Sequence, residues 1–138
     1  MAVASLSNAK KSIKFSKRAK SFTLQNMARL DVGRMYNKLG LSDLASYIYL
    51  DEYKHIKDYS LPYTKFRTKR AFANFLVAKG EFKKARKIFY EILSASPGMI
   101  STDNRAYCTF QIGDTFFEKD NLVLAQKYFK KTIQLTNT

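Results

Sequence analysis

Residues 79–90, KGEFKKARKIFY, contain one half of a unit that recurs along the chain. In this stretch Gly80 is followed five residues later by Ala85, and Ala85 is followed four residues later by Phe89. Similar columns occur 40 residues earlier and 40 residues later. The matching columns are Gly33, Ala73 and Gly113; Tyr36, Leu76 and Phe116; Ala45, Ala85 and Ala125; and Tyr49, Phe89 and Phe129. Because four columns keep one register in three copies, the sequence predicts a threefold internal repeat.

Each copy contains two segments whose apolar residues recur at spacings of three and four, which is typical of amphipathic helices. Gly40 and Gly80 stand between the two segments, and Asp120 with Asn121 takes this place in the third copy. Such residues end one helix and begin the next. The predicted helices lie near residues 23–39, 43–58, 63–79, 82–95, 103–118 and 121–136.

The small residues of the columns predict how the two helices of each copy pack. Gly33, Ala73 and Gly113 on the first helix leave room for the large aromatic residue of the second. One hairpin cannot bury both of its faces, so neighbouring copies must stack. We therefore expect an all-α fold of three stacked helix-turn-helix repeats that form a short right-handed solenoid. The expected domains are a basic N-terminal arm, residues 1–22, and the helical repeat domain, residues 23–138.

The pattern resembles the tetratricopeptide repeat (TPR) family. The residues of the second copy that match the family's pattern are Phe72, Ala73, Leu76, Gly80, Ala85, Phe89 and Pro97. The resemblance covers about residues 23–136. The period of 40 is longer than the family's period of about 34. The late small position of the second helix also holds Glu52, Ile92 and Thr132, so a related extended repeat is an alternative.

The resemblance implies a scaffold or adaptor that binds protein segments in a groove lined by the first helices. The residues expected to face this groove are Met27, Leu30, Arg34, Arg67, Arg70, Asn74, Tyr107, Phe110 and Asp114. Some relatives hold the C-terminal carboxylates of a chaperone with a set of lysines and asparagines. That set is not matched in this chain, so no such clamp is predicted.

The residues that carry chemistry do not form a recognisable catalytic or metal site. His55 is the single histidine and Cys108 the single cysteine, and neither has the partners that metal-ligand or nucleophile signatures require. The glycines stand at repeat positions and form no phosphate-binding loop. We expect no enzyme, no cofactor, no metal and no small-molecule substrate.

Positive charge is the most unusual bulk property, with 25 Lys and Arg against 11 Asp and Glu. Residues 1–30 contain seven basic residues and no acid, interleaved with apolar ones. Such a pattern suits an arm that contacts an anionic partner such as nucleic acid, while nuclear import, mitochondrial targeting, protein docking or a solvated tail are the alternatives. The residues expected to contact the anionic partner are Lys10, Lys11, Lys14, Lys17, Arg18 and Lys20 in the arm, and Lys83, Lys84 and Lys87 in the second copy.

These observations favour a non-enzymatic adaptor, a subunit of a larger protein complex whose basic surface docks on an anionic partner. A structural, RNA-contacting component of a ribonucleoprotein such as a ribosome is the alternative, and an acidic protein polymer is a third candidate partner. A single cysteine, no apolar run of about 20 residues and no secretory signal predict an intracellular protein without a membrane span. The cytoplasm is the first expectation, with mitochondrion and nucleus as alternatives.

Overall fold

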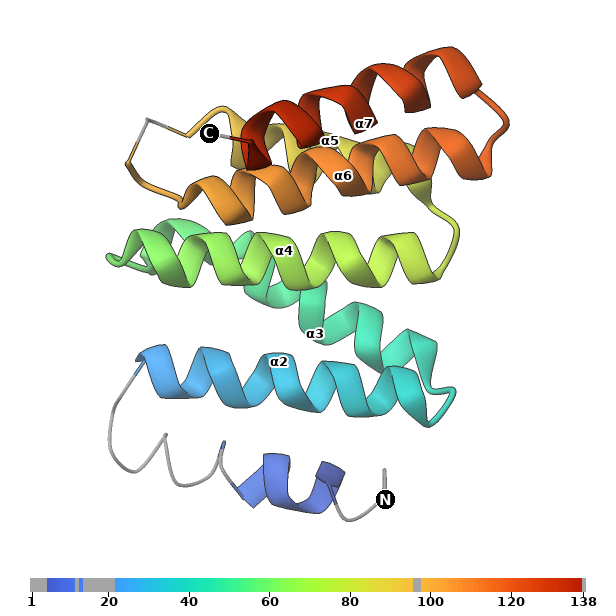
Figure 1. Ribbon diagram of the computed structural model, residues 1–138. Helices are drawn as coiled ribbons and strands as arrows, with labels where there is room; N and C mark the ends of the chain where they lie inside the picture. The colour runs from blue at the N-terminus through green and yellow to red at the C-terminus, as the bar shows by residue number, and fades with distance from the viewer. Residues whose placement is uncertain (1–4, 12, 14–21, 96–97, 138) are drawn as a thin grey trace. The chain divides into compact units, whose positions relative to one another are not determined.

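A computed structural model describes residues 5–11, 13, 22–95 and 98–137, and the secondary structure of these residues is helical, with no strand among them. The elements are α2 (Phe22–Lys38), α3 (Ser42–Lys54), the short 3-10 helix η1 (Ile56–Asp58), α4 (Pro62–Ala78), α5 (Phe82–Leu93), α6 (Thr102–Glu118) and α7 (Leu122–Thr136) (Figure 1). Each of the six predicted segments contains a helix. The all-α prediction is therefore confirmed.

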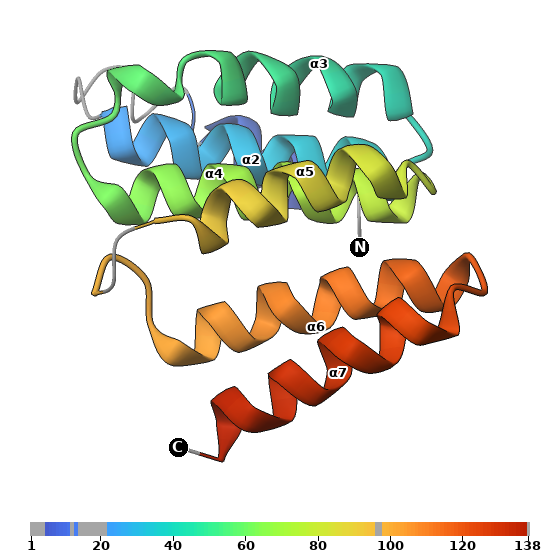
Figure 2. The ribbon, with the colours of Figure 1, turned by 90° about the horizontal axis from the view of Figure 1, so that it is seen from above.

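The helices form two compact units, residues 1–75 and residues 76–138. In the first unit α2 packs against α3. In the second unit α6 packs against α5 and α7, and the view from above in Figure 2 shows α6 and α7 side by side. Stacking of three copies into a right-handed solenoid stays a prediction.

The same turn joins the two helices of each copy. Gly40 and Gly80 have left-handed backbones, with φ of +79° and +77°, and Asp120 has φ of +57°. After each of the first two helices a backbone N–H donates across the turn, from Leu41 to the carbonyl of Tyr36 at 2.8 Å and from Glu81 to that of Leu76 at 2.9 Å. Glycine adopts this backbone without steric cost, which confirms the predicted helix ends at Gly40 and Gly80.

Two glycines inside helices allow close approach within a hairpin. A Cβ atom added at Gly33 would lie 3.1 Å from Cζ of Tyr49, and one added at Gly113 would lie 2.8 Å from Cδ1 of Phe129. The predicted contact between the small residue of the first helix and the aromatic residue of the second is thus confirmed in these two copies.

The sequence predicted no helix in residues 1–22, but residues 5–11 are helical. Ala9 of this segment is buried in a cluster with Val32 of α2 and Ile48 of α3, and Leu6 packs against the same cluster. An apolar spacing of three between Leu6 and Ala9 gives the segment one buried face. The strong positive charge of this part of the chain concealed that pattern. The boundary of the arm at residue 22 stays a prediction.

Tyr49 makes the stability of the fold sensitive to alkaline pH. Burial raises the pKa of its hydroxyl to about 12. Because the folded state holds the proton more tightly than the unfolded state, the stabilisation is complete below pH 10 and is lost as the pH rises from 10 toward 12. We expect the free energy of unfolding, measured with urea, to be lower at pH 11 than at pH 9.

Tyr49→Phe is expected to reduce that alkaline loss, because phenylalanine carries no titrating hydroxyl. Tyr90, whose pKa burial also raises to about 12, leaves part of the loss in the variant. An identical decline in the variant and the natural chain would contradict the assignment to Tyr49.

Candidate binding surfaces

The predicted groove residues lie on first helices of the hairpins. Six of them belong to the first unit and three to the second, so a single groove that includes all nine stays a prediction. On α2, Met27 is 43% exposed and Arg34 is exposed, whereas Leu30 is only 7% exposed and lies in the core. The half-buried residues on α4 are Arg67, Arg70 and Asn74. On α6, Phe110 is exposed, and Tyr107 and Asp114 are half-buried.

Arg67 belongs to a polar network that the sequence did not predict. Its centre is Asn26 of α2, which is completely buried. The side-chain amide of Asn26 donates to Oε1 of Glu52 at 2.9 Å and to Oγ1 of Thr68 at 2.8 Å. Its carbonyl oxygen accepts hydrogen bonds from Nη2 of Arg67 at 2.8 Å and from Nε at 3.3 Å. One asparagine thus connects α2, α3 and α4.

Glu52, a charged residue of this network, is also buried. Tyr59 donates its hydroxyl proton to Oε1 of Glu52 at 2.8 Å, and Nε of Arg29 lies 3.3 Å from Oε2. Arg29 also donates from Nη2 to Oδ2 of Asp51 at 2.9 Å. Burial, and then the hydrogen bond to Glu52, raises the pKa of Tyr59. The hydrogen bonds from Asn26 and Tyr59 and the ion pair with Arg29 offset the desolvation of the buried Glu52 carboxylate.

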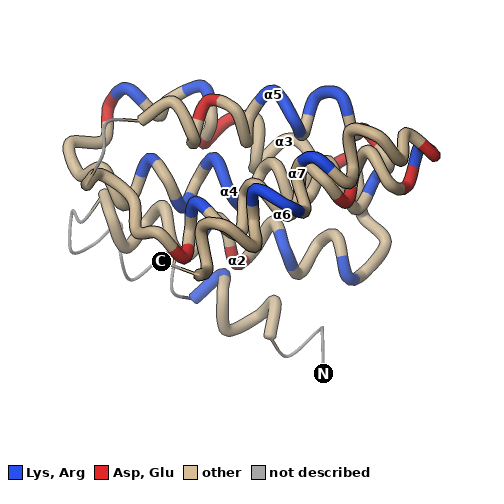
Figure 3. The backbone as a smooth tube through the Cα atoms, turned by 45° about the horizontal axis from the view of Figure 1, so that its top comes forward, with Lys and Arg blue, Asp and Glu red and all other residues tan. Residues whose placement is uncertain are grey.

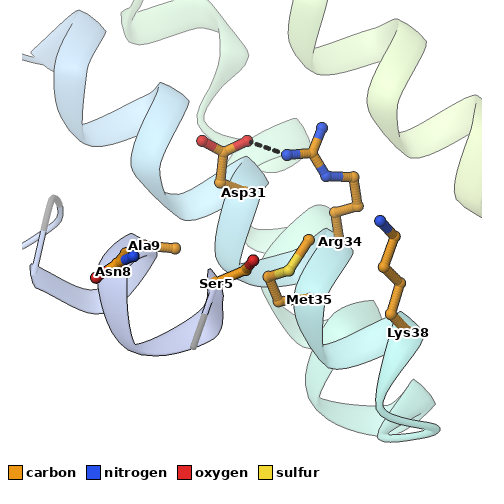
Figure 4. Close-up of a pocket in the computed structure, with 7 residues that line it drawn as sticks. All are labelled: Ser5, Asn8, Ala9, Asp31, Arg34, Met35 and Lys38. Carbon is orange, nitrogen blue, oxygen red and sulfur yellow. Dashed lines mark hydrogen bonds and ion pairs between the residues drawn. The ribbon is translucent and has the colours of Figure 1, made fainter. Parts of the chain in front are cut away.

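A shallow hollow of about 410 Å³ lies between the helical residues 5–9 and α2 (Figure 4). Its lining residues are Ser5, Asn8, Ala9, Asp31, Arg34, Met35 and Lys38. Arg34 donates from Nη2 to Oδ1 of Asp31 at 3.0 Å. The charge of this predicted groove residue is therefore already paired on its own helix.

The predicted basic surface of the second copy lies on α5. Lys83, Lys84 and Lys87 are exposed, while Ala85 and Phe89 of the same helix are buried. This confirms that the lysines lie opposite the apolar face. Nζ of Lys84 is 4.0 Å from Oε1 of Glu81.

The helix α7, which contacts α5, carries further exposed lysines. A hydrogen bond of 2.9 Å between the hydroxyls of Tyr90 and Tyr128 links α5 to α7. The exposed lysines of α7 are Lys127, Lys130 and Lys131. Nζ of Lys131 lies 5.0 Å from the ring centroid of Tyr128, a cation–π distance.

Charge is segregated among the three helices of the second unit. The helix α5 has four basic residues and one acid, and α7 has three basic residues and no acid. Between them in sequence, α6 has three acids and one basic residue. Figure 3 shows Lys and Arg residues along α5.

The basic residues predicted near the N-terminus fall into two groups. Lys10 and Lys11 are exposed on the helical segment 5–11, and Nζ of Lys10 lies 5.5 Å from the ring centroid of Tyr36. The others lie outside the described residues, and their contacts stay predictions: Lys14, Lys17, Arg18 and Lys20.

The described residues contain no group of three or more side chains that would hold a metal ion. Cys108 is buried. Nδ1 of the exposed His55 lies 2.8 Å from the backbone oxygen of Asp51, and this hydrogen bond, followed by the carboxylate charge of Asp51, raises the pKa of His55. Among the helices in the described part of the chain, none has both the length and the apolar character needed to cross a membrane. In comparisons with known proteins, no family model and no curated protein matches the sequence.

Proposed function

We propose that the chain is a non-enzymatic adaptor of the TPR-like type, with three hairpins that stack into a short right-handed solenoid within a larger protein complex. Its first helices hold a segment of a partner protein. Its second unit docks on an anionic partner through the exposed lysines of α5 and α7. We call these residues the basic face: Lys83, Lys84, Lys87, Lys127, Lys130 and Lys131.

The observation that carries this proposal is the segregation of charge in the second unit. A helix face needs some charge for solubility, but solubility favours both signs interspersed. Here two helices joined by the contact between Tyr90 and Tyr128 are basic, and the helix between them in sequence is acidic. A surface of one sign attracts and orients a partner of the opposite sign.

Neutralising part of the basic face tests the proposal. The partner is first recovered from the native source with the tagged chain and identified by mass spectrometry. Replacing Lys83, Lys87 and Lys127 with alanine is then expected to weaken its binding about tenfold, since each exposed charge contributes roughly 0.5 kcal/mol.

The matched control removes three exposed lysines that lie outside the basic face, Lys54, Lys57 and Lys119, and is expected to retain the natural affinity. Fluorescence anisotropy at 0.15 M salt measures both variants. Equal affinities of the two variants would contradict the assignment of the basic face.

A structural component of a ribonucleoprotein is the second candidate, favoured by the exposed Tyr90 within the basic face. Lysines and aromatic rings together suit RNA phosphates and bases. This candidate predicts loss of the recovered partners after nuclease treatment. It also predicts a fall in log affinity of roughly 0.7 per phosphate contact for each tenfold rise in salt. Retention of a defined set of proteins after nuclease treatment favours the adaptor.

A further inference from the structure

We propose that Arg67 of α4 is a preorganised binding site for a carboxylate on an acidic peptide segment of the partner protein, with Tyr63 beside it as an apolar contact. This inference rests on the proposed adaptor function and names the chemistry of the segment held by the first helices. The observation that supports this inference is that the completely buried Asn26 holds the Arg67 side chain in place.

The position of the Arg67 guanidinium is fixed before any ligand arrives. Oδ1 of Asn26 accepts from both Nε and Nη2 of Arg67, at 3.3 and 2.8 Å. Asn26 cannot rotate away without losing its bonds to Glu52 and Thr68. A long side chain that is already ordered loses less conformational entropy when a ligand binds.

The remaining donors of Arg67 match a carboxylate. An arginine side chain has five N–H donors in a rigid planar arrangement. The hydrogen bonds to Asn26 use only donors on Nε and Nη2. The edge formed by Nη1 and Nη2 carries parallel N–H groups that suit a carboxylate bound through both oxygens.

The charge of Arg67 is not balanced by the acids of the network. Glu52 and Asp51 both lie within ion-pair distance of Arg29. Arg67 instead bonds the neutral amide oxygen of Asn26, and α4 contains four basic residues and no acid. A half-buried cation beside a neutral acceptor favours an anionic ligand.

One exposed aromatic side chain flanks this cation. The carbon Cζ of Arg67 lies 5.6 Å from the ring centroid of Tyr63, and this tyrosine is 62% exposed. A preorganised arginine beside an exposed aromatic ring suits a peptide that carries an acid next to an apolar residue.

The test uses the full chain and four immobilised pools of nonapeptides with acetylated and amidated ends. The pools share random uncharged residues and differ only at the central position, which is Glu, Gln, phosphoserine or Ser. We expect retention on the Glu pool to exceed retention on the Gln pool about tenfold, the effect of one charge-assisted pair. Arg67→Met is expected to remove that preference.

Lys65→Met is the matched control, because it removes one positive charge from the same helix without touching the contact to Asn26. It is expected to keep the preference for Glu. Arg67→Met leaves Oδ1 of Asn26 without its donors, so its folding is checked by thermal melting. A measurement on the natural chain avoids this problem: the Nε–Hε NMR signal of Arg67 is expected to shift with the Glu pool and to stay in place with the Gln pool.

The outcomes separate this inference from the proposed function. Equal retention of the Glu and Gln pools with no shift of the Arg67 signal would overturn the carboxylate site, even if the basic face still binds its partner. A preference for phosphoserine over Glu would overturn the carboxylate assignment in favour of a phosphate. If the Glu preference is observed and the lysine variants have no effect, the Arg67 site stands and the docking role of the basic face is wrong.

Discussion

Replacing Asn26 with leucine is expected to lower the free energy of unfolding by about 3–5 kcal/mol. Leucine has the same branched skeleton with bulkier ends, so the change removes the hydrogen bonds and also crowds this completely buried site. Oε1 of Glu52 then keeps only the hydroxyl of Tyr59, and Arg67 loses its acceptor. The cost is large because the groups left behind include a buried carboxylate.

Urea unfolding followed by circular dichroism measures this loss. Gln25→Leu is the matched control: Gln25 is the preceding residue of α2 and is partly exposed. Its replacement is expected to change the free energy of unfolding by about 0.5 kcal/mol at most. A loss below about 1 kcal/mol for Asn26→Leu would mean that the network contributes little to stability.

Local sequence chemistry was sufficient to predict the helices α2 to α7, although not the helical residues 5–11. The turns at Gly40 and Gly80 follow from residues that are adjacent in the chain, because a left-handed backbone favours glycine wherever it occurs. The predicted helix 43–58 was too long, since α3 ends at Lys54. Tyr59 has an extended backbone, with ψ of 127°, and its hydroxyl reaches back to Glu52. The early end of α3 is therefore accompanied by the hydrogen bond between Tyr59 and Glu52.

The network around Arg67 was beyond sequence reasoning because its bonds join residues that lie far apart in the chain. Asn26 and Arg67 are 41 residues apart, and Asn26 and Glu52 are 26 apart. Hydropathy patterns assign polar residues to the surface. One signal was present: Asn26 stands four residues before Leu30 and seven before Gly33, on the buried stripe of α2. A polar residue in that phase is a candidate for a buried hydrogen-bonding role.

The basic face was only partly predicted for a related reason. The lysines of α5 were predicted because they cluster in the sequence, at positions 83, 84 and 87. Those of α7 lie on a helix that contacts α5 through Tyr128 and Tyr90, which are 38 residues apart. Charge density along the chain does not reveal which helices share a surface.

Replacing Gly113 with valine is expected to lower the free energy of unfolding by about 3 kcal/mol, the upper end of the cost of overpacking a core. A Cβ atom at Gly113 would lie 2.8 Å from both Cδ1 and Cε1 of Phe129 and 3.2 Å from Cβ of Tyr128. Valine adds two further methyl groups at this crowded point. Because α6 and α7 pack along their lengths, the helices must separate or the ring of Phe129 must move.

A double variant decides whether the contact with Phe129 is the cause. Phe129→Ala alone is expected to destabilise the chain by leaving a cavity, whereas in the Gly113→Val background the same change supplies the space that valine needs. The loss for the double variant should therefore be smaller than the sum of the two single losses by about 1 kcal/mol or more, as urea unfolding of all four chains will measure. Additive losses would mean that the destabilisation arises within α6 itself, from the low helix propensity of valine, and not from the approach of α7.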